Sequence, residues 1–136
     1  MASAHRPVRV VLIEDSAALR DLLAEMLADS GDVEIIGSAD SEPAAIDLLR
    51  RLHPDLAIID LELRGGTGLK VLAALRDMPA CADTPRAVVF SNHTNPLVRE
   101  RCQMLGAQAF FDKSFQLDEL LAYVHSAADE PGPRPG

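Results

Sequence analysis

Short apolar runs alternate with segments of helical periodicity five times along the chain, and this alternation most constrains the fold. The runs predict strands at residues 8–13, 33–38, 56–59, 87–90 and 109–111. A crossover helix returns the chain to the same edge of a sheet, so the alternation predicts parallel strands. Runs that are apolar throughout are expected where helices cover both faces. We therefore predict a doubly wound, flavodoxin-like (βα)5 domain of the α/β class, with a five-stranded parallel sheet in the order 2-1-3-4-5.

The helical segments differ in how well their apolar residues define one face. The first is the clearest, with Ser16 able to cap its start and Gly31 its end. The second is entered through residues 41–43 and stopped by 53–54, and the third ends before Pro79. The fourth has a thin stripe, so we expect it to be the most loosely held. The five stripes are Leu19, Leu22, Leu23, Met26 and Leu27; Ala45, Leu48, Leu49 and Leu52; Leu69, Leu72 and Leu75; Val98, Cys102 and Leu105; and Leu117, Leu120, Leu121 and Val124.

Size and charge restrict the class of protein. A chain of 136 residues suits one domain, which we place at residues 8–128, between flexible tails at 1–7 and 129–136. The net charge of −8 disfavours binding to nucleic acid. No apolar run approaches the roughly 20 residues of a membrane span. Cys81 and Cys102 have no metal-type spacing and read as free thiols, so we expect a soluble, cytoplasmic protein.

Polar side chains follow four of the expected strands at the point where each ends. They are Glu14 and Asp15, Asp60, Ser91 and Lys113. The carboxyl ends of parallel strands lie at one edge of a sheet, so these groups are expected to converge there. Each residue alone has an ordinary explanation as a cap, a turn residue or a solvated lysine. The combination indicates one site.

The chemistry of this set points to phosphoryl transfer. Three clustered carboxylates repel one another unless a cation intervenes, and oxygen-only ligands suit Mg²⁺ better than zinc. We expect Glu14 and Asp15 to hold the metal. Asp60 is the best nucleophile because it lies centrally, and a carboxylate can form an acyl phosphate. Ser91 and Lys113 would stabilise the charge of the transferred group.

With these residues placed, the chain resembles the receiver domain of two-component response regulators, most closely the single-domain kind typified by the chemotaxis regulator. The resemblance runs from about Arg9 to about Val124. It assigns the phosphoacceptor to Asp60. The other matching positions are the acidic pair Glu14 and Asp15, the metal-binding carbonyl of Glu62, the loop glycine Gly68, the hydroxyl of Ser91, the pair Gly106 and Ala107, the aromatic switch Phe110, and Lys113.

The resemblance implies a signalling mechanism. A sensor histidine kinase or a histidine phosphotransfer protein would donate a phosphoryl group to Asp60 in the presence of Mg²⁺. Ser91 would then move to meet the phosphoryl group and Phe110 would turn inward, which would change the surface of the fourth helix and fifth strand for a downstream protein partner. Such a chain is no enzyme beyond its own phosphoryl transfer and slow dephosphorylation.

Three positions depart from the family pattern. Arg64 stands where a proline is usual, Asn92 where a small residue is usual, and Ser114 where a proline usually follows the lysine. Asn92 can screen Asp60 from water or from a partner, so we predict an unusual phosphoryl lifetime. His93 is expected to be a surface histidine.

Three alternatives remain open. A Mg²⁺-dependent phosphohydrolase would carry its nucleophile after the first strand with a second Asp two residues on, where this chain has Ala17 after Asp15. A flavin mononucleotide module would need a phosphate loop, where residues 14–16 are acidic. The third is the regulatory half of a DNA-binding response regulator.

Overall fold

A five-stranded parallel sheet forms the centre of the molecule, in the order β2-β1-β3-β4-β5, which confirms the predicted topology. The computed structural model describes residues 6–29, 31–78, 85–93 and 95–129. Strands and helices alternate along the whole of this part. The strands are β1 (Val8–Ile13), β2 (Val33–Ala39), β3 (Leu56–Ile59), β4 (Arg86–Ser91) and β5 (Ala109–Asp112), and the helices are α1 (Ala17–Ala28), α2 (Glu42–Leu52), α3 (Gly68–Asp77), α4 (Pro96–Met104) and α5 (Leu117–Asp129).

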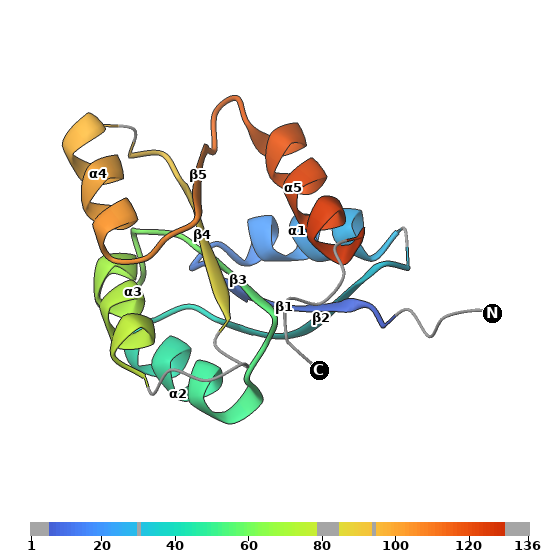
Figure 1. Ribbon diagram of the computed structural model, residues 1–136, viewed down its shortest axis with the longest axis horizontal. Coiled ribbons are helices and arrows are strands. Elements are labelled where there is room, and N and C mark those ends of the chain that lie inside the picture. Colours follow the sequence, from blue (N-terminus) through green and yellow to red (C-terminus); the bar gives the residue numbers. More distant parts are fainter. Residues whose placement is uncertain (1–5, 30, 79–84, 94, 130–136) are drawn as a thin grey trace.

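Helices cover both faces of the sheet, α1 and α5 on one and α2, α3 and α4 on the other (Figure 1). Successive strand residues point to opposite faces. Val11 and Ile13 of β1 therefore pack in the core beneath α2, α3 and α4, while Val10 and Leu12 pack beneath α1 and α5. Since both faces are buried, the central strands are mostly apolar, as in the four fully buried residues of β3, although Arg9 interrupts β1.

Ser16, Ser41 and His53 start or end helices as predicted. Ser16 Oγ accepts a hydrogen bond from the Leu19 amide at 3.2 Å, and Ser41 caps α2 in the same way. His53 ends α2 in the left-handed conformation with φ of 47°. The loop that contains Gly65 and Gly66 ends on Thr67, whose side chain caps α3. Gly31, with φ of 81°, follows α1 and donates to the Ala28 carbonyl.

The apolar stripe predicted for the first helix is wrong at one position. Leu23 and Leu27 are fully buried, whereas Leu22 is 44% exposed. The buried direction of α1 is centred between Leu23 and Leu27, and Leu22 lies at the far edge of the stripe, outside the contact with the sheet. The spacing of leucines on a helix identifies the apolar face but does not determine which of its edges is buried against the sheet.

Some boundaries extend beyond the predicted ones. β2 continues to Ala39, β4 runs from Arg86 to Ser91, and β5 includes Asp112. Helix α5 reaches Asp129, one residue past the predicted end of the domain. Residues 1–5 and 130–136 of the predicted tails lie outside the described residues, as do Pro79 and Cys81.

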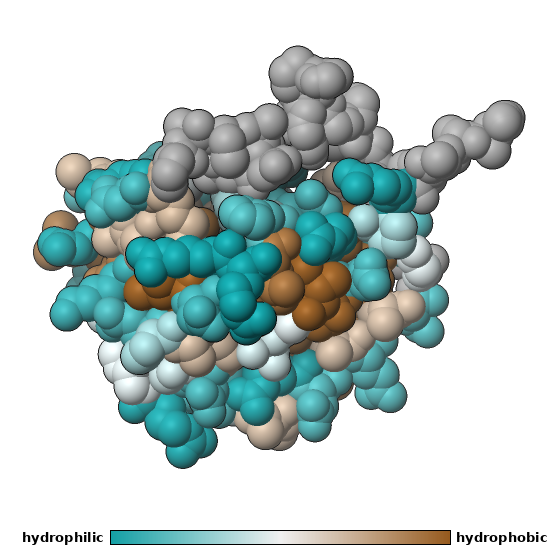
Figure 2. Space-filling model, turned by 90° about the horizontal axis from the view of Figure 1, so that it is seen from below, coloured by the Kyte–Doolittle hydropathy of each residue, from teal (hydrophilic) through white to brown (hydrophobic). Residues whose placement is uncertain are grey.

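The described part of the face drawn in Figure 2 is mostly hydrophilic. On the face seen from below in Figure 1, hydrophilic side chains surround a smaller area of apolar surface (Figure 2). Within residues 6–29, 31–78, 85–93 and 95–129, no helix has both the length and the apolar character needed to cross a membrane.

Candidate functional site

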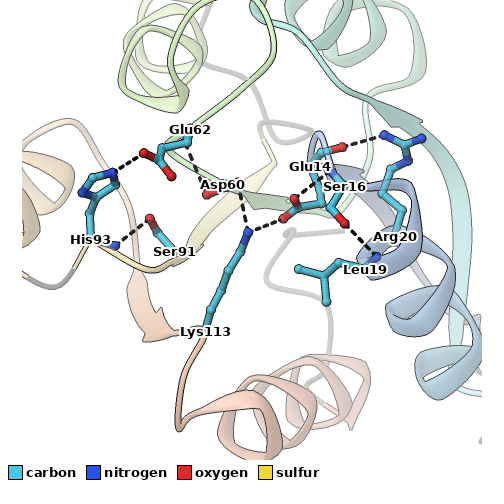
Figure 3. Close-up of polar contacts among 9 residues, drawn as sticks. All are labelled: Glu14, Ser16, Leu19, Arg20, Asp60, Glu62, Ser91, His93 and Lys113. Carbon is cyan, nitrogen blue, oxygen red and sulfur yellow. Dashed lines mark hydrogen bonds and ion pairs between the residues drawn. The ribbon is translucent and has the colours of Figure 1, made fainter.

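The carboxyl edge of the sheet brings the predicted site residues together (Figure 3). The last residues of β1 and β3 are paired, Ile13 with Ile59, and Ser91 of β4 is paired with Asp112 of β5. β1 and β3 therefore end level, as do β4 and β5, whose ends lie two residues further on because Ile59 is paired with Val89. The pairing continues into the site, because the Asp60 amide donates to the carbonyl of Ile13 at 2.8 Å.

Lys113 lies between two buried carboxylates. Its Nζ is 2.9 Å from Glu14 Oε1 and 3.1 Å from Asp60 Oδ2. The side chains of Glu14 and Asp60 are only 4% and 5% exposed. Main-chain amides bind their other oxygens: Ser16 donates to Glu14 Oε2 at 3.0 Å, and Glu62 to Asp60 Oδ1 at 3.3 Å. The predicted reach of Lys113 to the acidic side of the site is therefore present in the structure.

Burial dominates the electrostatics of the two acids. Desolvation raises the pKa of Glu14 and of Asp60, and the hydrogen bonds and charge of Lys113 offset it only in part. Burial by itself would lower the pKa of Lys113, but hydrogen bonds and charge interactions with Glu14 and Asp60 outweigh it and raise that pKa. The pKa values of all three groups are therefore raised, those of the two acids mainly by burial and that of Lys113 by its contacts with both acids.

The carboxylate cluster fits a divalent cation. Glu14, Asp15 and Asp60 each place one oxygen within 4.8 Å of the others. When all are ionised, three carboxylates face a single ammonium group, so the cluster carries surplus negative charge. An oxygen-only donor set suits a hard cation such as Mg²⁺. The residues present therefore fit the metal predicted from the sequence.

Glu62 faces the site through its backbone, while its side chain is turned away. Its carboxylate Oε2 lies 2.8 Å from Nε2 of His93, in the loop that follows β4 (Figure 3). His93 is at the surface, as predicted, yet it belongs to the rim of the site. Ser91 is fully buried, and its Oγ accepts a hydrogen bond from the amide of His93 at 3.1 Å.

Lys113 is oriented by a turn that the sequence analysis did not foresee. The Ser114 amide donates to Oδ1 of the buried Asp112 at 2.6 Å, and the Asp112 amide donates to Gln116 Oε1 at 2.8 Å. A proline at position 114 would have no N–H to donate. Ser114, which replaces the usual proline, therefore supplies a hydrogen bond. The sequence did contain a signal for this turn, because an Asp lies two residues before Ser114.

The loop after β3 is fixed to the loop after β2. The Glu42 amide donates to the Gly65 carbonyl at 2.7 Å, and the Arg64 amide donates to the Asp40 carbonyl at 3.0 Å. Thr67 donates to Glu42 Oε1 at 3.3 Å. Like Ser114, Arg64 stands where a proline is usual, and like Ser114 it donates a main-chain hydrogen bond that a proline could not make. Main-chain hydrogen bonds therefore hold this side of the site.

Two further residues position the site. Arg20 of α1 donates from Nη1 to the Glu14 carbonyl at 2.7 Å, which fixes the backbone beside the acidic pair. Gly68 begins α3 directly against the end of β3, where an added Cβ would overlap the carbonyl oxygen of Asp60 and lie 2.9 Å from Ile59 Cγ2. Arg20 had no local signal in the sequence, because its acceptor is a main-chain carbonyl.

The predicted switch residue Phe110 lies in β5 beside α4. The Arg99 guanidinium lies 4.8 Å from the centre of its ring, an arrangement that suits a cation–π contact. Helix α4 buries only Cys102 fully, in agreement with its thin apolar stripe. A groove of about 430 Å³ runs between α4 and β5, lined by both Arg99 and Phe110.

Comparisons with known proteins agree with this geometry. Residues 10–125 match the family described as response regulator receiver domain. The chain is 31% identical over 128 residues to the nitrate/nitrite response regulator protein NarL of Escherichia coli K12, covering 93% of this chain and 57% of that protein. It is 30% identical over 140 residues to a protein-glutamate methylesterase/protein-glutamine glutaminase of Koribacter versatilis, covering 95% of this chain and 38% of that protein.

Solved structures show the same fold. The signal receiver domain of the response regulator NarL from Mycobacterium tuberculosis superposes with a TM-score of 0.81 at 29% identity, covering 93% of this chain and 99% of that one. The response regulator domain of Thermotoga maritima CheB gives a TM-score of 0.81 at 21% identity, with coverage of 93% and 99%. The chain thus spans about half or less of these curated relatives and nearly all of the solved receiver domains.

Proposed function

The chain belongs to the response regulator receiver family, and on this basis we propose that it accepts a phosphoryl group on Asp60 from a phosphohistidine. The observation that carries the proposal is the contact of Lys113 with Asp60 and Glu14 at one edge of the sheet. It supports a site with an acceptor carboxylate at the centre, acids on one side and a cation beside it. The donor would be a sensor histidine kinase or a histidine phosphotransfer protein.

Glu14, Asp15 and Asp60 would hold Mg²⁺, together with the backbone carbonyl of Glu62. When bound, the metal would supply positive charge to the phosphoryl oxygens and offset the repulsion among the carboxylates. The clustering of three carboxylate oxygens within 4.8 Å supports this assignment.

The chain's own residues would carry out the transfer in one displacement. A carboxylate oxygen of Asp60 forms the new bond to phosphorus as the P–N bond to the donor imidazole breaks, and the electron pair of that bond stays on the imidazole nitrogen. The Lys113 ammonium is placed to stabilise charge on the phosphoryl oxygens. Ser91 would then turn its hydroxyl toward the phosphoryl group, and Phe110 would move into the space that Ser91 leaves.

The output would be a change in the surface formed by α4 and β5, read by a protein partner. This fits the sparse burial of α4, because an element held by few apolar contacts can shift at small cost. Because the relatives are longer, the partner can also be a second domain of the same protein, as in the DNA-binding alternative. Donors that draw their phosphoryl group from ATP work in the cytoplasm, so we place the chain there.

The membership of the family argues against the phosphohydrolase alternative, and turnover can test it. We expect intact-mass measurement after treatment with acetyl phosphate and Mg²⁺ to show one added phosphoryl group on the wild type and none on Asp60→Ala. Asp47→Ala is the matched control, because Asp47 is an exposed carboxylate on α2, and it should label like the wild type. Equal labelling of Asp60→Ala would move the acceptor elsewhere. Continuous release of phosphate would instead favour the hydrolase.

A further inference from the structure

A side-chain contact connects the two loops that flank Asp60. His93 Nε2 lies 2.8 Å from Glu62 Oε2, with side-chain exposures of 49% and 65% (Figure 3). Glu62 is two residues past Asp60, after β3, and His93 is two residues past Ser91, the last residue of β4. The pair therefore crosses the outer rim of the site, above the buried cluster.

Each partner of this pair also holds a site residue through its main-chain amide. The His93 amide donates to Ser91 Oγ at 3.1 Å, and the Glu62 amide donates to Asp60 Oδ1 at 3.3 Å. The contacts form one connected path from Asp60 through Glu62 and His93 to Ser91. A change in the position of the Ser91 hydroxyl must therefore break or move a contact in this path.

We propose that the Glu62–His93 pair is a latch that holds the Ser91 hydroxyl in its resting position. The inference rests on the proposed function, in which Ser91 moves toward a phosphoryl group on Asp60. To make that move, Ser91 must give up the hydrogen bond from the His93 amide, and the amide is restrained because the His93 side chain is bound to Glu62. His93 and Glu62 are thus positioning residues, with their side chains acting through Ser91.

A different explanation would give each side chain an independent effect on an anionic phosphodonor. The Glu62 carboxylate would repel the donor, and a protonated His93 would attract it. Removal of the two side chains would then change the phosphorylation rate in opposite directions. A latch predicts the same direction for both removals, because either one breaks the single contact. The double variant also distinguishes the two explanations. If both side chains act through one contact, the second removal adds nothing to the first.

The test measures the rate at which acetyl phosphate labels the protein, by intact mass at saturating Mg²⁺ and pH 7. We expect His93→Ala and Glu62→Ala each to label faster than the wild type by about 1.4- to 5-fold, the range that corresponds to loss of one exposed polar contact. The double variant should label no faster than the faster single variant. Opposite effects of the two single variants, or multiplication of their effects in the double variant, would overturn the latch.

A matched control breaks an ion pair away from the site. Asp47→Ala removes the pair between Arg51 and Asp47 on α2, which has a similar N to O distance of 2.9 Å and exposures of 61% and 67%. We expect this variant to label at the wild-type rate. The same acceleration in Asp47→Ala would show that any lost ion pair produces it, which would also overturn the latch.

A second readout does not depend on phosphorylation. Amide hydrogen exchange, measured by NMR on the unphosphorylated protein without Mg²⁺, should become about 1.4- to 5-fold faster at His93 in Glu62→Ala. The Asp60 amide, bound to the Ile13 carbonyl, should keep its rate. Unchanged exchange at His93 would overturn the latch. If the wild type takes up no phosphoryl group, the proposed function fails, and exchange at His93 still decides whether the pair holds this loop.

Discussion

Asp60→Asn should stabilise the metal-free protein at neutral pH, although Asp60 is bound by Lys113. With an effective dielectric of about 20, the contact with Lys113 at 3.1 Å is worth about 5 kcal/mol. Repulsion at the 4.8 Å limit of the cluster is about 3.5 kcal/mol from each of Glu14 and Asp15. These Coulomb energies are of similar size, and desolvation, the largest cause of the raised pKa of Asp60, adds to the cost of its charge. We expect Asp60→Asn to raise the free energy of unfolding by about 2 kcal/mol.

The effect should depend on pH in a specific direction. The pKa of Asp60 is raised above its ordinary value of 3.8, with burial as the main cause. The native state therefore keeps the Asp60 proton to higher pH than the unfolded chain does. As the pH rises from 3.8 through the raised native pKa, the wild type loses stability that the Asn variant does not lose. The stability difference should open across this window and then stay level up to neutral pH.

Magnesium should reverse the order of the two proteins. A ligand present at 100 times its dissociation constant stabilises the native state by about 2.7 kcal/mol. Asp60→Asn replaces one of the three proposed carboxylate ligands, so it should gain much less. Urea unfolding between pH 4 and 8, with EDTA or with Mg²⁺, measures both effects, and Asp47→Asn controls for removal of an exposed carboxylate. A less stable Asp60→Asn in EDTA, or an equal gain from Mg²⁺ in both proteins, would refute the reasoning.

Three smaller predictions concern residues that shape the site. Ser114→Pro removes the amide bound to Asp112 and should lower the free energy of unfolding in urea by about 1–3 kcal/mol; Ser114→Ala keeps the amide, so an equal loss there would point to the hydroxyl instead. Gly68→Ala places a Cβ against the main-chain carbonyl of Asp60 and 2.9 Å from Ile59 Cγ2, and it should lower the stability in thermal unfolding by about 1–3 kcal/mol; a neutral result would show that α3 can shift. Asn92→Ala should change the decay rate of the phosphorylated protein, and an unchanged rate would remove Asn92 from the account.

The fold could be predicted because each of its signals is local and repeated. Runs such as residues 56–59 are apolar at every position, which only a strand covered on both faces requires. Parallel strands then place their carboxyl ends at one edge, so the convergence of Asp60 and Lys113 follows from topology alone. The contact distances of Lys113 agree with that expectation.

The remaining features depend on partners that are distant in sequence. Leu22 has the same side chain as Leu23, and only the packing of α1 on the sheet decides which one is buried. Arg20 binds a main-chain carbonyl, which has no sequence signature. His93 was placed correctly at the surface, but its pairing with Glu62 depends on how two loops face each other. Sequence patterns identify elements and their ends more readily than contacts between loops.

The two sides of the site are built with different stiffness. On the side of α2, backbone hydrogen bonds from Glu42 and Arg64 tie one loop to another. On the side of α4, the described part of the loop is held by the Ser91 hydroxyl and by the contact of His93 with Glu62 at the surface. The loop on the α2 side of Asp60 is therefore held more firmly than the loop on the α4 side. If a phosphoryl group on Asp60 strains the site, we therefore expect the structure to change on the side of α4 and not on the side of α2.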